Sequence, residues 1–500
     1  MQIQFENQYI NTYQNLYSQT KRTQLVMEAV VPDVNDDIGR IISVQSSVLL
    51  KSKEAYSKRI CISGEVHAVL LYITEGDEKV SGVKLSKPFD LEYENEEFSP
   101  DTLGQIELTI LNNEARILNP RKVAVTTELA GELTAYRQAK ALVKTSLTKD
   151  SPDGLHVKED SVKAFFADLV QEKTFAVTEQ FAFDSSQATP QQLLSQRVNL
   201  TCTETQQIGS RLIVKGIAEI QVWYLADGIA YPLKARFKEP FSQILDASDT
   251  AYEYSRTGFT LTSSYFDLVD TISGDKALEM ELHVLAQTTG YRAENVEYIS
   301  DVYSNRAPVK FEACDRNLIR DMHSFSEYIN SSEMLPFVDD CAEIYTVFSQ
   351  ITQVFCTSGA LSVSVPLEIL YATKTGTLAS VRRVLQLSKE LTKPADRILQ
   401  IEINDLTIRQ NEGNVEARLS IELFLENITE KQISMITSVD LDLEEAFDME
   451  AFPTFSLVRT EEESLWELAK EYHSSIMAIE EMNETAEQAK GRILLIPKQI

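Results

Sequence analysis

The stretch RICISGEVHAVLLYITEG at residues 59–76 returns later in the chain as RLIVKGIAEIQVWYLADG at residues 211–228. The two stretches align without a gap, so that Gly64, Tyr72 and Gly76 of the first match the same residue types in the second. Apolar and polar residues alternate in both, which is the pattern of an antiparallel strand with one buried face. The repeat therefore predicts several copies of one mainly β unit.

A third, weaker copy lies further along the chain. The segment 335–355 resembles the segment 31–50. LSVSVPLEILYATKTG at 361–376 resembles the two stretches quoted above, because it too ends with a tyrosine followed a few residues later by a glycine. Val363 stands where the other copies have a glycine, and Pro366 interrupts the strand. Because proline cannot donate a hydrogen bond to a sheet, we expect Pro366 at a sheet edge or a bulge.

The chain of 500 residues is too long for one hydrophobic core. A further strand-rich segment ends each copy, at 123–136, 277–291 and 415–428. We expect a mainly β fold, in which three tandem β-sandwich-like domains are followed by a small α/β domain. The predicted domain limits are 1–140, 160–295, 305–450 and 452–500.

The connections between these domains are more polar than the strands. Segment 141–160, which contains a Pro-Asp-Gly turn, and segment 305–340 are interpreted as linkers. The intervening SVKAFFADLV at 161–170 is interpreted as a helix. Within PDVNDD at 32–37, an aspartate is expected to cap a short helix that begins near Ile38, in preference to binding Ca²⁺.

The charge of the chain excludes one class of partner. Against 47 Lys and Arg stand 76 Asp and Glu, for a net charge of −29. Such a chain repels nucleic-acid phosphate and anionic lipid head groups, so we expect no nucleic-acid partner. No apolar run reaches the length of about 18 residues that a membrane helix needs, and the N-terminal residues lack a signal-peptide core. We therefore expect a cytoplasmic protein with reduced thiols and no membrane span.

The sequence offers no catalytic constellation. The five histidines form no pair with metal-ligand spacing. No phosphate-binding glycine loop, dinucleotide fingerprint or Gly-x-Ser-x-Gly motif is present. We assign no catalytic residue, no metal and no cofactor, and we do not expect an enzyme.

The C-terminal region differs from everything before it. ESLWELAKEYHSSIMAIEEMN at 463–483 begins with a Ser-x-x-Glu capping box at Ser464 and Glu467, which predicts a helix start. Apolar residues at helical spacing then form one stripe: Leu465, Leu468, Ala469 and Tyr472. A second short helix ends at Asn483, and a strand-like segment lies on either side of the pair. The predicted order is strand, helix, helix, strand.

This region resembles a LysM module in its Ser-Leu-Trp helix start, its Leu468-Ala469 pair, Asn483 and the ending Leu494-x-Ile496-Pro497. LysM modules commonly bind N-acetylglucosamine-containing glycans in a shallow groove between the loops before the first helix and after the second. The resemblance implies a partner- or glycan-binding groove formed by Glu462, Glu463, Ser464, Leu465, Trp466, Met482 and Asn483. Glu462-Glu463-Ser464 stands where these modules usually have Gly-Asp-Thr; the lost glycine and the adjacent carboxylates favour a protein partner over a neutral sugar. Trp466 either completes the core of the module or is an exposed aromatic anchor.

The repeated units carry a second resemblance. VVPDVNDDIGRIISV at 30–44, followed by SGEVHAVLLYITEG at 63–76, resembles the SPOCS domain, a family named for sporulation and coat assembly. Tandem SPOCS-like units followed by a LysM module resemble clostridial spore-coat morphogenetic proteins. The resemblance implies a non-enzymatic scaffold on the mother-cell side of the forespore, whose LysM module docks a coat-basement ATPase. The alternative is binding of peptidoglycan or another N-acetylglucosamine-containing glycan. Exposed sheet edges would also allow a homo-oligomer.

Overall fold

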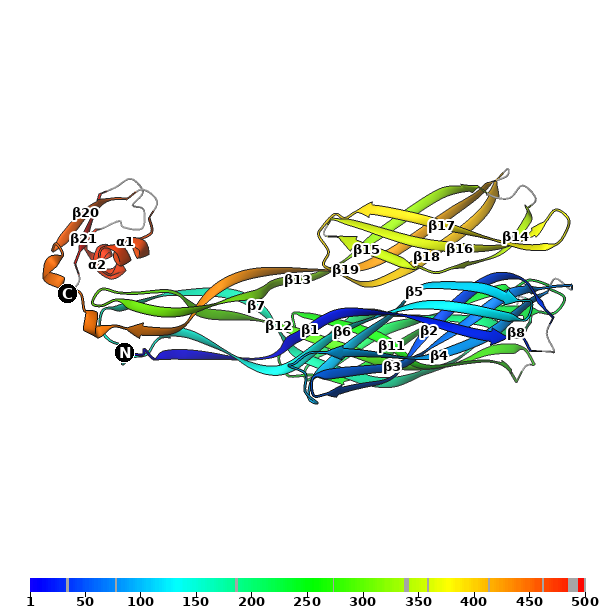
Figure 1. Ribbon diagram of the computed structural model, residues 1–500, viewed down its shortest axis with the longest axis horizontal. Helices are drawn as coiled ribbons and strands as arrows, with labels where there is room; N and C mark the ends of the chain where they lie inside the picture. The colour runs from blue at the N-terminus through cyan, green and yellow to red at the C-terminus, as the bar shows by residue number, and fades with distance from the viewer. Residues whose placement is uncertain are drawn as a thin grey trace.

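The computed structural model is an elongated molecule with β-sandwiches at one end, a stalk of long strands in the middle and a small helical module at the other end (Figure 1). The prediction of a mainly β fold is confirmed. No helix in the described part of the chain is long and apolar enough to cross a membrane. The structure describes residues 1–32, 36–76, 79–184, 188–272, 274–336, 341–357, 359–411, 414–460, 463–483 and 493–498.

The first unit consists of two antiparallel sheets packed face to face. One sheet has the order β1 (Phe5–Val30), β6 (Lys122–Leu147), β5 (Leu103–Asn119), and the other β2 (Ile38–Tyr56), β3 (Arg59–Thr74), β4 (Val80–Glu94). Alternate residues of the central strands β3 and β6 meet between the sheets, among them Ile62, Val66, Val125 and Leu133. The alternation read from the sequence is thus the alternation between core and surface.

The second unit repeats this topology. The sheet β8 (Pro190–Ile208), β9 (Arg211–Ala226), β10 (Leu233–Asp246) packs on β7 (Leu155–Ala182), β12 (Lys276–Ser304) and β11 (Tyr254–Asp270). In the third unit, β14 (Cys341–Ser349), β15 (Gln353–Thr357), β16 (Ala360–Thr373) and β17 (Leu378–Glu390) pack on β13 (Val309–Pro336), β19 (Asn414–Leu441) and β18 (Arg397–Asn411). The strands of the units run past the predicted domain limits, which remain a prediction.

Pro366 lies in β16, which is a central strand of its sheet, so the expected edge position is wrong. On one side Pro366 pairs with Val384 of β17. On the other side β14 pairs with residues 367–373 and β15 with residues 360–364, so the two short strands leave a break opposite Pro366. Pro366 has no N–H to donate, and because the neighbouring strand is interrupted at this point, no hydrogen bond from Pro366 is needed there.

The repeat glycine has a packing reason. A Cβ on Gly64 would lie 2.5 Å from the ring of Phe89 on the neighbouring strand, and one on Gly216 would lie 2.4 Å from the ring of Phe241. The phenylalanine covers the glycine in both units, as aromatic residues often do across strands. In the third unit the paired residues are Val363 and Leu387. The third unit thus replaces both the glycine and the phenylalanine that covers it. Without the phenylalanine ring, Val363 has room for its side chain, which explains why the third copy lacks the glycine.

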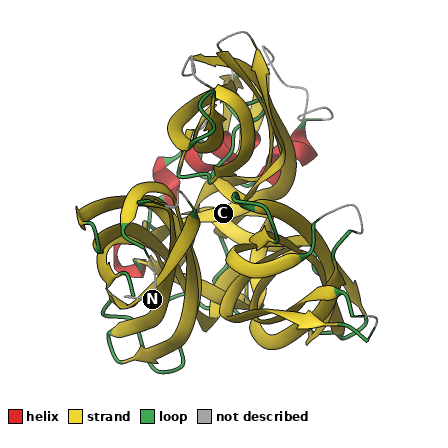
Figure 2. Ribbon diagram, turned by 90° about the vertical axis from the view of Figure 1, so that its right-hand side faces the viewer, coloured by secondary structure: helices red, strands yellow, loops and turns green. Residues whose placement is uncertain are grey.

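The three sandwiches form a triangle around the long axis of the molecule (Figure 2). Equivalent strands of the three units meet at this axis and share one apolar core. One matched set comes from the three units, Leu71, Trp223 and Leu370, each one residue before the repeat tyrosine; Ile42, Leu194 and Phe348 pack beside it. Trp223 stacks on Phe348 with ring centroids 5.2 Å apart. Residues at equivalent places in the repeat thus pack against one another.

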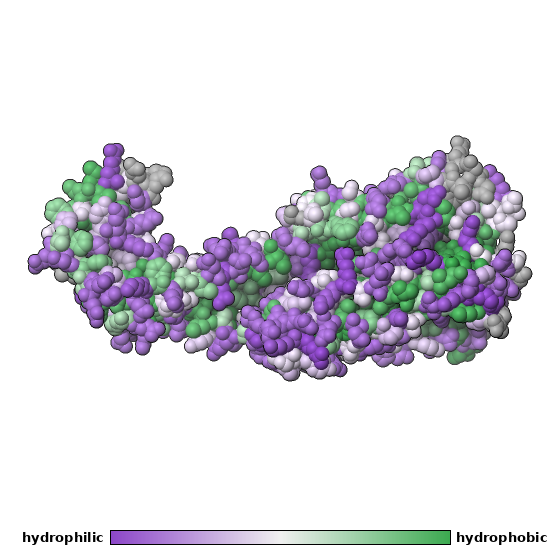
Figure 3. Space-filling model, viewed as in Figure 1, coloured by the Kyte–Doolittle hydropathy of each residue, from purple (hydrophilic) through white to green (hydrophobic). Residues whose placement is uncertain are grey.

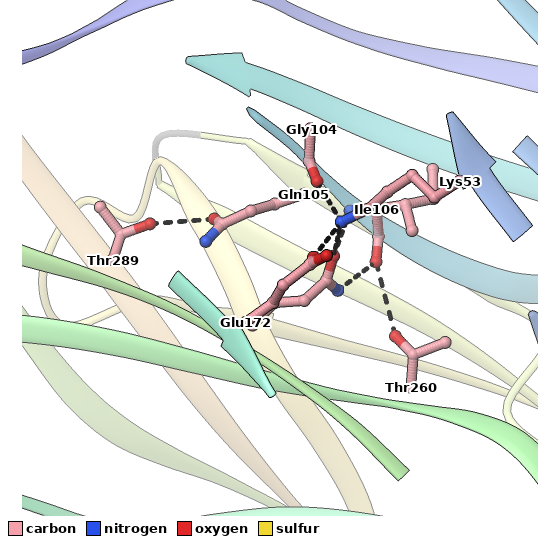
Figure 4. A network of polar contacts seen from close by, with 8 residues as sticks. Lys53, Gly104, Gln105, Ile106, Glu172, Thr260 and Thr289 are labelled. Atoms are coloured by element: carbon pink, nitrogen blue, oxygen red, sulfur yellow. Dashed lines mark hydrogen bonds and ion pairs between the residues drawn. The ribbon is translucent and has the colours of Figure 1, made fainter. Parts of the chain in front are cut away.

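Side-chain contacts run in a circle from each unit to the next. Between the first and second units, the amide of Gln287 on β12 bonds the N–H and C=O of Ile106 on β5 at 2.9 and 2.8 Å, as a neighbouring strand would (Figure 4). The second and third units are joined by Arg256 of β11 and Glu426 of β19, and the third and first by Arg397 of β18 and Glu132 of β6. Each contact joins the corresponding two strands, so the circle is closed within one chain.

The stalk consists of three strand pairs, here called ribbons, one from each unit: β1 with β6, β7 with β12, and β13 with β19. Ile319 of β13 also pairs with Phe165 of β7, which joins the second and third ribbons into one six-stranded sheet. Each ribbon has a β-bulge where it leaves its sandwich, at Asn15/Tyr17, Gly290/Tyr291 and Ile319/Asp321. At the tip the ribbons share an apolar core of Ile3, Phe5, Leu155, Ile299, Val302, Ala307, Ile436, Val439 and Leu441. The stalk is therefore a packed structure in its own right.

The structure overturns three interpretations of the sequence. Strands β6, β7 and β13 occupy most of the supposed linkers 141–160 and 305–340, although the Pro-Asp-Gly turn does lie in the connection 148–154 between β6 and β7; the supposed helix 161–170 lies inside β7. Ile38 begins strand β2 instead of a helix, and Asp37 forms an ion pair with Arg121 at 2.7 Å. Asp33 lies outside the described residues. A narrow ribbon buries few residues, so its strands look polar in the sequence.

Two single-turn helices, Leu443–Glu445 and Met449–Ala451, lead from the stalk to the terminal module. The module contains β20 (Phe455–Arg459), α1 (Leu465–Glu471), α2 (Ile476–Met482) and β21 (Ile493–Pro497), with β20 and β21 antiparallel. The order of elements is the one that the sequence predicts. Apolar residues of both helices and of β21 are buried together in its interior: Leu468, Ala469, Ile479, Leu494 and Ile496.

Candidate functional site

The helices of the module begin as their sequence dictates. The Ser464 hydroxyl accepts from the Glu467 N–H at 3.3 Å, and the Glu467 carboxylate accepts from the Ser464 N–H at 2.7 Å. This capping box also lowers the pKa of Glu467, because the carboxylate accepts hydrogen bonds. Ser475 caps α2 by accepting from the Ala478 N–H. The two short helices are thus fixed at their N-terminal ends.

Trp466 lies in the contact between the module and the stalk. Its side chain is only 9% exposed, and its ring meets Tyr303 of β12 edge to face with centroids 4.8 Å apart. The indole N–H donates to the Asp301 carboxylate at 2.8 Å, and the Lys470 ammonium pairs with the same carboxylate at 2.7 Å. The sequence left open whether Trp466 is buried or exposed, and in the structure it is buried.

The ionisable groups of this contact have shifted pKa values. Burial opposes ionisation of Asp301, but the hydrogen bonds from Lys470 and Trp466 outweigh burial and lower its pKa. Tyr303 donates its hydroxyl to the Ser474 carbonyl at 3.0 Å, and burial raises the pKa of Tyr303. His156 stacks on the other side of Tyr303, and burial lowers its pKa. The surroundings therefore favour the ionised form of Asp301 and the neutral form of His156.

Asn483 closes the end of the module. Its amide donates to the carbonyls of Ile479 and Leu495 at 2.7 and 2.8 Å, and its oxygen accepts from the Leu495 N–H at 3.0 Å. Each hydrogen-bonding atom of this side chain therefore has a partner within the module. The side chain holds β21 against the end of α2.

The other residues of the predicted groove are placed as follows. Glu463, Ser464 and Met482 are exposed, and Leu465 is half-buried against the core of the module. Glu462 lies outside the described residues, as does most of the loop after α2. The described part of the chain thus brings Trp466 and Asn483 into structural contacts and leaves Glu463 and Met482 at the surface. Their role as a binding groove stays a prediction.

The outer face of the two-stranded sheet is apolar and exposed. Phe455, Leu457 and Ile493 are 57%, 69% and 66% exposed. Across the sheet, Phe455 lies opposite Pro497 and Leu457 opposite Leu495. Apolar residues gather on this side of the module, which is turned away from the sandwiches (Figures 1 and 3). Clustered exposed apolar residues of this kind are typical of interaction surfaces.

A second feature is a cleft of about 870 Å³ lined by residues of all three ribbons. Arg256 pairs with Glu426 at 3.1 Å, and the Tyr254 hydroxyl donates to Glu426 at 2.7 Å. Arg397 pairs with Glu132. These two ion pairs account for part of the charge of the cleft, which Lys140, Arg316 and Glu430 also line.

Sequence patterns did not indicate which stalk residues contact the module. Asp301 and Tyr303 lie more than 160 residues before Trp466, in a segment that reads as an ordinary strand. Within the described residues, no group of three or more His, Cys, Asp or Glu side chains could hold a metal ion.

No family model, curated protein or solved structure matches the chain. The resemblances to LysM and SPOCS domains therefore rest on the residues quoted above, and what they imply for function is a proposal.

Proposed function

We propose that the chain is a non-enzymatic scaffold that uses its terminal module to dock a protein partner. In line with the resemblance to spore-coat assembly proteins, the proposed partner is a coat-basement ATPase at the forespore surface, on the mother-cell side. The SPOCS-like units and their stalk hold the module at a distance from the rest of the assembly.

The observation that carries this proposal is the apolar row of Phe455, Leu457 and Ile493 on the outer face of the module. Leaving three large apolar side chains in water is costly: burying one is worth roughly 1.5–3 kcal/mol. A partner that covers them would gain this free energy. The row lies at the end of the molecule, where no sandwich obstructs access (Figure 1).

Two further observations favour a protein partner over a glycan. Sugar-binding sites need a free aromatic face, but the ring of Trp466 packs on Tyr303 and its N–H is taken by Asp301. They also need unpaired polar groups, but the amide of Asn483 is fully used within the module. Glycan binding through the predicted groove remains the alternative function.

The scaffold part of the proposal is supported by how the three units are joined. Apolar side chains at the axis and a closed circle of polar contacts fix the sandwiches to one another. The ribbons share further cores along the stalk. Such a body keeps its shape, so a partner bound at the tip is held at a fixed distance from anything bound at the sandwiches.

The test is binding of the full-length chain to a purified coat-basement ATPase, measured by calorimetry. We expect binding by the natural chain and a loss of binding by Leu457→Asp, which puts a charge into the apolar row. The control is Met477→Asp, since Met477 is also exposed but lies on α2. In parallel, N-acetylglucosamine oligomers should give no heat of binding. Sugar binding that Trp466→Ala abolishes would replace the proposal with the glycan alternative.

A further inference from the structure

The two edges of the small sheet in the module are not alike. On β21, the N–H and C=O of Leu495 both bond the Asn483 amide, and the Pro497 carbonyl accepts from the Ser474 hydroxyl. Pro497 has no N–H to offer. The outer edge of β21 is therefore closed by side chains of the module itself, and a further strand has no place there.

Among the described residues, none pairs with the outer edge of β20. The Lys498 N–H donates to the Thr454 carbonyl at 2.9 Å, which fixes the hydrogen-bonded pairs of the ladder. In an antiparallel ladder such pairs alternate with pairs whose backbone groups point outward. Phe455, Leu457 and Arg459 occupy these alternate positions, so their N–H and C=O groups point away from β21. None of these outward groups bonds another residue in the described part of the chain.

We infer that the docked partner adds an extended strand to this open edge of β20. The inference rests on the proposed function and says how the partner is recognised. Strand addition takes its affinity from backbone hydrogen bonds and its specificity from alternate side chains. The added strand would bond Phe455, Leu457 and Arg459 and lay its own apolar side chains beside Phe455 and Leu457. The backbone edge and the apolar row thus form one surface.

The charge of the chain indicates the kind of strand. A second copy would bring another net charge of −29 to the contact, and like charges oppose association. The two helices of the module carry further exposed acids, Glu471, Glu480 and Glu481, which increase this repulsion. The expected occupant is therefore a segment of a different protein, with apolar residues at alternate positions and Lys or Arg on either side.

The first test changes one backbone group. Leu457→Pro removes the outward N–H of Leu457 but no hydrogen bond to β21, because Leu457 faces Leu495 in a pair without mutual hydrogen bonds. We expect the affinity of the full-length chain for the purified coat-basement ATPase to fall by about tenfold or more, the cost of an unpaired backbone group. Leu457→Ala keeps the N–H and should lose less. Met477→Ala is the matched exposed control and should bind normally.

The second test reads the amides themselves by hydrogen exchange. In the free chain, the amides of Ser456 and Val458 should exchange slowly and those of Phe455, Leu457 and Arg459 rapidly. In the complex the latter three should become slow. Slow exchange at Ser456 and Val458 in Leu457→Pro would show that the variant still folds.

The outcomes separate the inference from the proposed function. If the natural chain binds the ATPase, but Leu457→Pro binds equally well and the three amides stay rapid, strand addition is wrong and docking stands. If the natural chain does not bind at all, both are wrong. If light scattering shows a dimer of the chain that Leu457→Pro dissociates, the occupant of the edge is a second copy and the choice of a basic partner is overturned.

Discussion

The two tryptophans of the chain lie at opposite ends of the molecule and are held in different ways. Trp223 sits on the axis of the sandwiches, stacked on Phe348 within an apolar core that all three units share. Trp466 joins the module to a single ribbon, with its N–H on Asp301 and its ring against Tyr303. The sandwiches are thus joined by packing from every side, and the module by a few contacts on one side. We expect the module to come loose while the sandwiches stay intact.

The largest effect on stability is expected from Trp223→Ala. Trp223 is almost fully buried, so its removal leaves a cavity where three units meet. We expect a loss of about 4–5 kcal/mol in the free energy of unfolding, the upper end for such substitutions. Denaturant unfolding followed by circular dichroism measures it, and Trp223→Phe, which can still stack on Phe348, should lose much less. A loss below about 1 kcal/mol would show that the units do not depend on this core.

Trp466→Ala should cost less and act elsewhere. We expect about 3 kcal/mol, the lower end of the same range, because one side of Trp466 lies near the surface of the molecule. The loss should appear as faster hydrogen exchange at the amides of α1 and α2, while the amides of β9 and β16 keep their protection. If hydrogen exchange of the sandwich amides accelerated equally, the module and the sandwiches would unfold together, and the expectation that the module detaches first would be wrong.

Acid should loosen the module and leave the sandwich axis unchanged. The pKa of Asp301 is lowered, so its stabilisation is complete above the ordinary value of about 3.9 and is lost as the pH falls through the folded value. The pKa of His156 is also lowered; an unfolded histidine takes up a proton near pH 6.5, so stability begins to fall below that pH. Fluorescence of Trp466 in a Trp223→Phe background should therefore begin to change below about pH 6.5 and change further below the ordinary Asp value of about 3.9.

Two variants assign this pH dependence. Asp301→Asn should weaken the contact by about 1 kcal/mol at neutral pH, a modest value because Lys470 is partly exposed, and should remove the change at the lowest pH. His156→Gln should reduce the change that starts near pH 6.5, and His473, whose pKa is also lowered by burial, should account for the rest. A fluorescence change that persists undiminished in both variants would locate the pH sensitivity elsewhere.

The smallest expected effect is at the start of α1. Ser464→Ala removes the cap of the first helix and should destabilise the module by about 0.5–1 kcal/mol. Ser475→Ala, at the start of α2, is the matched variant and should behave alike. Exchange at the amides of each helix measures both, and an effect in the sandwiches from either would be unexpected.

The sequence predicted what depends on local pattern. Alternation in 59–76 and 211–228 predicted strands, and Ser464 with Glu467 predicted the start of a helix, because neighbouring residues determine both. The stalk was missed because each of its ribbons buries only a narrow row of residues, so 141–160 and 305–340 look like polar connections. In 161–170, apolar residues are spaced in a way that also fits a helix, and pairing with β12 decided in favour of a strand.

The contact of the module was beyond what the sequence could predict. Nothing near Trp466 indicates that Asp301, 165 positions earlier, supplies its hydrogen-bond partner. The sequence near Trp466 favoured neither a buried nor an exposed side chain. Contacts with Asp301 and Tyr303, from another part of the chain, bury it. The equivalence of Leu71, Trp223 and Leu370 could be read from the repeat, but their meeting on one axis could not.

Every unit starts and finishes at the stalk tip, where the amino group of Met1 donates to the carbonyl of Leu441. This has a mechanical consequence. Tension between the module and the sandwich end would load many rungs of the long ribbons at once, in shear, and should meet high resistance. Tension between the first residue and the module would instead peel β1 from its neighbours one rung at a time. The molecule should therefore resist force along its long axis much better than force applied between β1 and the module.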